Sequence, residues 1–190
     1  ETLGAPVVKD GQPRLSVNYA YVPFPSHLPA YCDSYMTSPL VLDLHMDGVR
    51  TLPVEAGTRF DIDGSGNAVR VGWIAPGDDA FLVLDLNRNG RIDSGAELFG
   101  NATRLPNGNL ASNGFEALAQ YDGDKNRRID RKDPVYSQLG LWLDANSDGE
   151  SQGTEISSLS SQQIEFISVK HIEVAEIDLR IDALGEKVNA

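Results

Sequence analysis

Residues 139–155, LGLWLDANSDGESQGTE, join an apolar run to a polar segment with a specific spacing. Counting from Asp144, side-chain oxygens fall at positions 1, 3 and 5, Gly149 falls at position 6, and Glu155 falls at position 12. This is the spacing of an EF-hand calcium loop, in which the chain wraps around the ion, turns on the glycine and closes with a glutamate. The same residue types also form polar surface turns that bind no metal.

The spacing recurs along the chain, which favours the metal interpretation. In the segment that starts at Asp85 the glutamate falls at position 13, and in the segment that starts at Asp122 the glycine of position 6 is replaced by Arg127. Because polar turns alone do not need a carboxylate at position 1 every time, the repetition is hard to explain without a bound cation.

Two further copies are less complete. The copy that starts at Asp61 has no carboxylate at position 12 or 13, although Asp78 and Asp79 could close it from a distance. The copy that starts at Asp43 has His45 at position 3, and imidazole is a poor calcium ligand. We expect this fifth copy to be a tight hairpin turn rather than a metal site.

The predicted calcium ligands come from four loops. They are the residues whose side-chain oxygens fall at the ligand positions, together with the residue at position 7, which such loops use through its backbone carbonyl. They are Asp144, Asn146, Asp148, Glu150 and Glu155; Asp85, Asn87, Asn89, Arg91, Asp93 and Glu97; Asp122, Asp124, Asn126, Arg128 and Asp133; and Asp61, Asp63, Ser65 and Asn67. The expected cofactor is therefore Ca²⁺, as several ions, and we predict no catalytic residue.

The composition agrees with a calcium protein. The chain has 28 acidic and 16 basic residues and a formal net charge of -12, so bound cations would relieve self-repulsion in the folded state. A solvated acidic surface explains this charge but not the spacing. The charge argues against nucleic acid as a partner, and no stretch approaches the roughly 20 apolar residues of a membrane span.

The chain divides into an extended arm rich in proline and tyrosine, residues 1–38, and a module, residues 39–190. Short apolar runs between turns at 39–85 predict a small, largely antiparallel sheet. Short helices are expected at 97–99, at 114–121 with Asn113 as the cap, and after Asp133-Pro134. Apolar and polar residues alternate at 162–169 and at 172–181, which predicts strands. The predicted fold class is α+β, with several EF-hand-like loops.

Four segments carry a resemblance to a known family: SPLVLDLHMDGVRT (38–51), GWIAPGDDAFLVLDLNRNGRIDSGAELFGNAT (72–103), NGFEALAQYD (113–122) and LWLDANSDGESQGTEISSL (141–159). Over about residues 38–170 the chain resembles the calcium-dependent self-processing module of RTX-type secreted bacterial proteins. The resemblance implies a compact α+β module that is ordered by calcium. It also implies calcium-triggered cleavage of an Asp-Pro bond at the start of the module, after which the freed aspartyl carbonyl can be joined to a lysine.

The chain departs from that family at the bond itself, which here is Ser38-Pro39. An aspartate carboxylate can attack its own peptide carbonyl to form a five-membered anhydride, and serine cannot. The hydroxyl of Ser38 could attack the carbonyl of Thr37 instead, but the sequence identifies no base for that step.

Two classes of function follow. The favoured one is a calcium-binding module without catalytic activity, folded or rigidified by Ca²⁺. The alternative is a calcium-triggered autoproteolytic module with altered chemistry at Ser38-Pro39. The family resemblance implies an extracellular, cell-surface or periplasmic location, and the candidate partner besides calcium is another protein or a domain of the parent polypeptide.

Overall fold

The computed structural model describes residues 5–9, 12–19 and 39–170. Its largest element is a six-stranded sheet with the order β1-β2-β3-β8-β10-β11, in which all neighbours are antiparallel. The strands are β1 (Ala5–Lys9), β2 (Gln12–Tyr19), β3 (Leu40–Asp43), β8 (Asp79–Leu84), β10 (Leu139–Trp142) and β11 (Ile156–Ser158).

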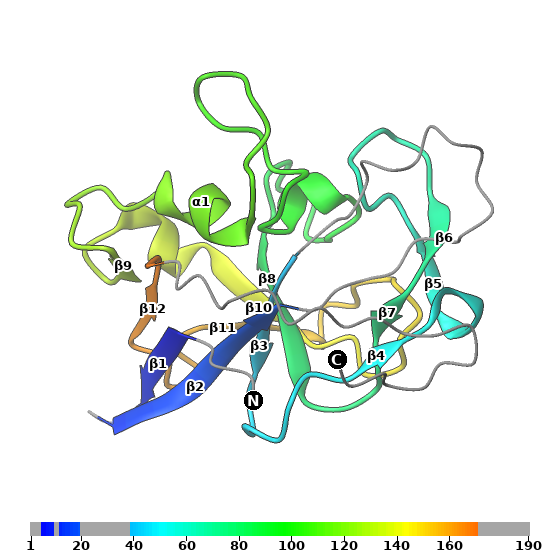
Figure 1. The fold of residues 1–190 in the computed structure, drawn as a ribbon, viewed down its shortest axis with the longest axis horizontal. Helices are drawn as coiled ribbons and strands as arrows, with labels where there is room; N and C mark the ends of the chain where they lie inside the picture. Colours follow the sequence, from blue (N-terminus) through cyan, green and yellow to red (C-terminus); the bar gives the residue numbers. More distant parts are fainter. Residues whose placement is uncertain (1–4, 10–11, 20–38, 171–190) are drawn as a thin grey trace, which may run out of the picture.

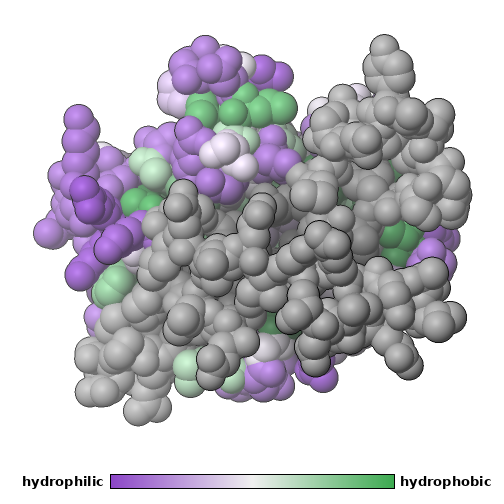
Figure 2. Space-filling view, viewed as in Figure 1, coloured by the Kyte–Doolittle hydropathy of each residue, from purple (hydrophilic) through white to green (hydrophobic). Residues whose placement is uncertain are grey.

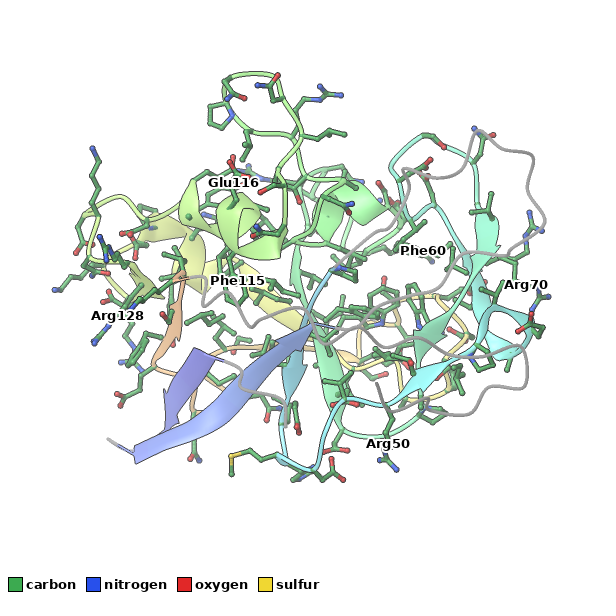
Figure 3. All side chains as sticks on the ribbon, viewed as in Figure 1. Arg50, Phe60, Arg70, Phe115, Glu116 and Arg128 are labelled. Carbon is green, nitrogen blue, oxygen red and sulfur yellow. The ribbon has the colours of Figure 1, made fainter. Side chains whose placement is uncertain are left out.

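The central strands β3, β8 and β10 are buried on both faces, which explains why their sequences are continuously apolar. Alternate residues enter two separate cores, because successive side chains of a strand point to opposite faces. Leu82 of β8 lies in the first core, whereas Phe81 and Val83 lie in the second. Figure 3 shows Phe115 of the first core and Phe60 of the second on either side of the sheet.

Smaller elements cover the two faces (Figure 1). The first core is covered by α1 (Gly114–Ala119), by the 3₁₀ turn η3 (Pro134–Ser137) and by a two-stranded sheet of β9 (Arg128–Asp130) and β12 (Phe166–Ser168). The second is covered by β4 (Thr51–Leu52) paired with β7 (Trp73–Ile74), and by β5 (Thr58–Phe60) paired with β6 (Val69–Val71). The remaining 3₁₀ turns are η1 (Val54–Ala56) and η2 (Gly95–Glu97).

The predicted α+β class is wrong. Within the described residues α1 is the one α-helix, and it has only 6 residues. The turns expected to be helices at Glu97 and after Asp133 are 3₁₀ turns of 3 and 4 residues. The polar loops and the turns next to them use most of the chain between strands, so the fold consists mainly of small antiparallel sheets.

Several local predictions are confirmed. The side chain of Asn113 accepts a hydrogen bond from the backbone N–H of Glu116 and caps α1. Pro134 occupies the first turn of η3. The strand expected at 162–169 is present only as β12, residues 166–168, and the one expected at 172–181 lies outside the described residues. The same holds for most of the arm, of which β1 and β2 are described.

The described part of the chain contains no helix that is long and apolar enough to cross a bilayer.

Candidate metal centres

The five polar loops have one backbone conformation, and we name each by its first residue: loops 43, 61, 85, 122 and 144. Positions 4 and 6 are left-handed in every loop, with φ between 55° and 97°. These residues are Met46, Gly64, Arg88, Lys125 and Ser147 at position 4, and Gly48, Gly66, Gly90, Arg127 and Gly149 at position 6. Arg127 therefore adopts, at φ 65°, the turn that glycine makes in the other four loops.

The carboxylate at position 1 organises each loop by accepting backbone N–H groups that point inward. In loop 144, Asp144 accepts from Asp148 at 3.2 Å through Oδ1 and from Gly149 at 2.8 Å through Oδ2. The aspartates of loops 61, 85 and 122 accept from positions 5 and 6 in the same way. In loop 43, Asp43 accepts from positions 4, 5 and 6. The spacing thus encodes a local structure in which carboxylates gather on the inside.

The closing carboxylates of loops 85 and 122 make equivalent contacts. Glu97 accepts the N–H groups of Leu86 at 3.1 Å and Asp93 at 3.0 Å, which are positions 2 and 9 of loop 85. Asp133 accepts the N–H groups of positions 2 and 9 of loop 122 at 2.8 and 3.0 Å. The longer glutamate at position 13 therefore reaches the place that an aspartate reaches from position 12.

In loop 144 the closing carboxylate makes part of this pattern. Glu155 accepts the N–H of Gln152, at position 9, and the indole N–H of Trp142 at 3.4 Å, both through Oε2. No bond to position 2 is formed in this loop.

Loop 122 brings three carboxylates together. Oxygens of Asp122, Asp124 and Asp133 all lie within 4.8 Å of one another, so these groups could hold a metal ion. Asn126 and Asp130 lie at the same loop, since the amide of Asn126 donates to Asp124 and Asp130. The atoms that could coordinate an ion here are all oxygens, which are hard ligands and suit calcium or magnesium better than a transition metal.

Loop 43, expected to be a hairpin turn only, holds the second such group among the described residues. Asp43, Asp47 and Asp78 have oxygens within 4.8 Å of one another, and Asp78 also contacts His45. The expectation that Asp78 and Asp79 serve loop 61 is therefore wrong. Asp79 is the first residue of β8 and Asp78 precedes it. Because β8 pairs with β3, Asp79 lies opposite Asp43.

Asp79 provides an independent indication of a cation at loop 43. It is 4 % exposed; its Oδ2 accepts the N–H of Arg50 at 3.0 Å, and its Oδ1 is buried without a partner. Burial raises the pKa of Asp79, and the neighbouring carboxylates Asp43, Asp78 and Asp47 raise it further. A cation bound by Asp43, Asp47 and Asp78 would offset this repulsion, so the donor set of loop 43 fits a hard divalent ion.

Loops 85 and 144 rely on asparagine as well as carboxylate oxygens, and they are joined to each other. The N–H of Ile92 donates to Oγ of Ser151 at 2.6 Å, and that hydroxyl donates back to the carbonyl of Ile92 at 3.2 Å. Both residues are at position 8. Loop 144 is also tied to the second core, because the indole N–H of Trp73 donates to Oδ2 of Asp144 at 2.6 Å. The spacing identified neither Ser151 nor Trp73.

Loop 61 is the least complete site. Asp61 and Asp63 bind the N–H of Ser65, as position 1 and position 3 do elsewhere, but no carboxylate closes the loop. The predicted ligand Asn67 is exposed. Instead, the carbonyl of Asp61 accepts the N–H of Gly95, which attaches this loop to the end of loop 85.

A comparison with protein families decides the relationship of the chain. The family model described as SPM domain matches residues 40–188, which include all five loops. The chain belongs to the SPM domain family.

This SPM domain is also similar to a curated bacterial protein. It is 39 % identical over 142 residues to the iron-regulated protein FrpA of Neisseria meningitidis serogroup C. The match covers 74 % of this chain and 13 % of FrpA, so the SPM domain spans only a small part of the length of that relative.

The buried carboxylates predict that any metal ion held by these loops would bind more weakly in acid. Burial raises the pKa of Glu97 above its ordinary 4.5 and the pKa of Asp144 above its ordinary 3.8. Glu97 belongs to loop 85 and Asp144 to loop 144, and an ion at either loop needs the carboxylate of that loop ionised, so protons compete with the ion from above these values. We expect the dissociation constant for calcium to be several-fold higher at about pH 5 than at about pH 7, measured by calorimetric titration.

The same shifts act in the opposite direction on the metal-free chain. A raised pKa in the folded state means that Glu97 and Asp144 contribute most to stability below their ordinary pKa values, and that this contribution is lost as the pH rises through the raised values. A calcium affinity that is equal at both pH values would contradict the assignment of these two residues as ligands.

Proposed function

We propose that this chain is a calcium-binding module of a secreted or surface bacterial protein, stabilised by Ca²⁺ and without catalytic activity of its own. The observation that carries the proposal is the shared design of the loops. In each loop the carboxylate at position 1 accepts hydrogen bonds from two or three inward-pointing N–H groups. In three loops a closing carboxylate also accepts the N–H of position 9.

Calcium is favoured over magnesium by the number of protein oxygens that each loop offers. Calcium takes 6 to 8 oxygen ligands in flexible geometry, whereas magnesium keeps several waters and accepts few protein ligands. Two loops hold clusters of three carboxylates, and the others combine carboxylates with amide or hydroxyl oxygens. Loops of this incomplete kind suit the millimolar calcium found outside the cell. The similarity to a part of FrpA supports the proposal that this module belongs to a longer bacterial protein.

The test combines two measurements on one sample. Calcium is titrated into the chain while circular dichroism and intact mass are recorded. We expect the spectrum to change and saturate, and we expect the mass to stay constant for hours. The reason for the constant mass is that Ser38 lacks the carboxylate that would attack its own carbonyl, although Pro39 makes the bond a tertiary amide.

The variant Ser38→Asp is the matched comparison, because it supplies that carboxylate and changes no loop. A fragment that begins at Pro39 in the unmutated chain would overturn the proposal in favour of autoproteolysis. A spectrum and heat signal that ignore calcium would overturn the calcium function itself.

A further inference from the structure

Loop 122 carries a concentration of positive charge that calcium binding does not need. Five of the 16 lysine and arginine residues of this acidic chain lie within residues 125–132. They are Lys125, Arg127, Arg128, Arg131 and Lys132, and all five are exposed. We name them the basic tip.

The backbone directs these side chains outward. Lys125 and Arg127 occupy the two left-handed positions of the loop, and in β9 the buried Ile129 turns its neighbour Arg128 to the outer face. The guanidinium of Arg128 lies 4.3 Å from the ring centroid of Phe166, which holds it in place. Figure 3 shows Arg128 at the opposite end of the molecule from Arg70, and the surface at that end is strongly hydrophilic in Figure 2.

The cations of the basic tip are not consumed by ion pairs. Within the described residues, the ion pairs connect Asp78 with His45 and with Arg50, far along the chain from loop 122. Lys170, two residues after β12, adds another exposed cation beside the tip, because β12 pairs with β9 and the N–H of Val169 donates to the carbonyl of Arg127. Several cations without an ion pair at one end of the molecule form a surface for a partner of opposite charge.

A hollow of about 400 Å³ lies at the edge of the basic tip. Arg131, Ser137, Ser158 and Ser160 line it, together with Asp133 of loop 122, whose carboxylate accepts two backbone N–H groups. Guanidinium and hydroxyl groups both donate hydrogen bonds, and a guanidinium can grip a carboxylate through two parallel bonds. Arg131 is therefore the cation that this hollow offers to a carboxylate, and an ion bound at loop 122 would neutralise Asp133 beside it.

We propose that the basic tip, with this hollow, binds an acidic polypeptide segment rich in carboxylates. Three of its five cations are arginines, which bind planar carboxylates better than lysine does. The spread of cations from loop 122 to β9 suits an extended chain with several negative side chains, and the hollow takes one of them.

The calcium dependence of this interaction rests on the proposed function of loop 122. Residues 122–133 carry five cationic and four anionic side chains. Three of the anionic side chains are the clustered Asp122, Asp124 and Asp133. One bound divalent ion would change the local net charge from +1 to +3. It would also neutralise the carboxylates that otherwise repel an acidic partner.

The test uses a fluorescent peptide of about 15 glutamates and the full chain, at low ionic strength because salt screens exposed charges. Anisotropy gives the dissociation constant with calcium, with chelator and with magnesium at equal concentration. We expect Arg127→Gln/Arg131→Gln to weaken binding about tenfold, as expected for two exposed ion pairs. The control Arg88→Gln/Arg104→Gln also removes two exposed arginines, one of them left-handed, and should change binding less than about twofold.

Each outcome decides a separate point. Equal weakening by both double variants, or no binding of the peptide by the unmutated chain, would overturn the basic tip as a docking surface. Binding to vesicles with anionic phospholipids but not to the glutamate peptide would overturn the acidic polypeptide as its partner. If the tip variant weakens binding equally with calcium and with chelator, the surface stands and calcium binding by loop 122 fails.

Discussion

Saturating calcium is expected to raise the thermal stability of the chain by the largest amount of any single change. A ligand that binds only the folded state adds about 2.7 kcal/mol per site to the free energy of unfolding when its concentration is a hundred times its dissociation constant. The three loops with a closing carboxylate, 85, 122 and 144, would then add about 8 kcal/mol. The physical reason is the charge of -12 and the carboxylates that the loops gather on their inner sides.

The measurement is a melting curve by circular dichroism with calcium, with magnesium and with chelator. Magnesium should raise the melting temperature less, because it accepts fewer protein oxygens. Equal melting temperatures under all three conditions would rule out calcium binding by the folded chain.

The second large effect is expected for Asp144→Ala. Asp144 is 1 % exposed and accepts the indole N–H of Trp73 and the N–H of Gly149, both of which the substitution leaves buried without a partner. An unsatisfied buried donor costs about 1–3 kcal/mol. We therefore expect Asp144→Ala to lower the free energy of unfolding about 2 kcal/mol more than the matched variant Asp85→Ala.

The comparison isolates the contact with the core. Both variants remove the position-1 carboxylate of a loop, but Asp85 is less buried and has no indole partner. Urea unfolding at one fixed calcium concentration gives both free energies. If the two variants lose the same stability, the bond between Trp73 and Asp144 contributes nothing, and loop 144 is no more firmly held than loop 85.

The loops and the short strands were predictable because they depend on neighbours in sequence. A carboxylate at position 1 reaches the N–H groups of positions 5 and 6 across a few residues, so the spacing alone determines the turn. Even the two irregular copies follow this rule, since Arg127 adopts the left-handed turn and Glu97 reaches the same N–H groups from position 13. The cap of α1 by Asn113 is local in the same sense.

The tertiary structure decided how the loops are completed and held. Strand pairing brings Asp78 and Asp79 to loop 43 rather than to loop 61, over a separation of more than thirty residues that no spacing rule covers. Packing of the second core carries Trp73 to Asp144, and the pairing of two position-8 residues joins loops 85 and 144. The fold class was also decided at this level: the pairing of distant strands builds most of the structure, and the turns expected to be helices stay single 3₁₀ turns. The sequence by itself thus determined the local carboxylate loops, and only the folded chain determined which distant groups complete them, because those contacts depend on strand register and core packing.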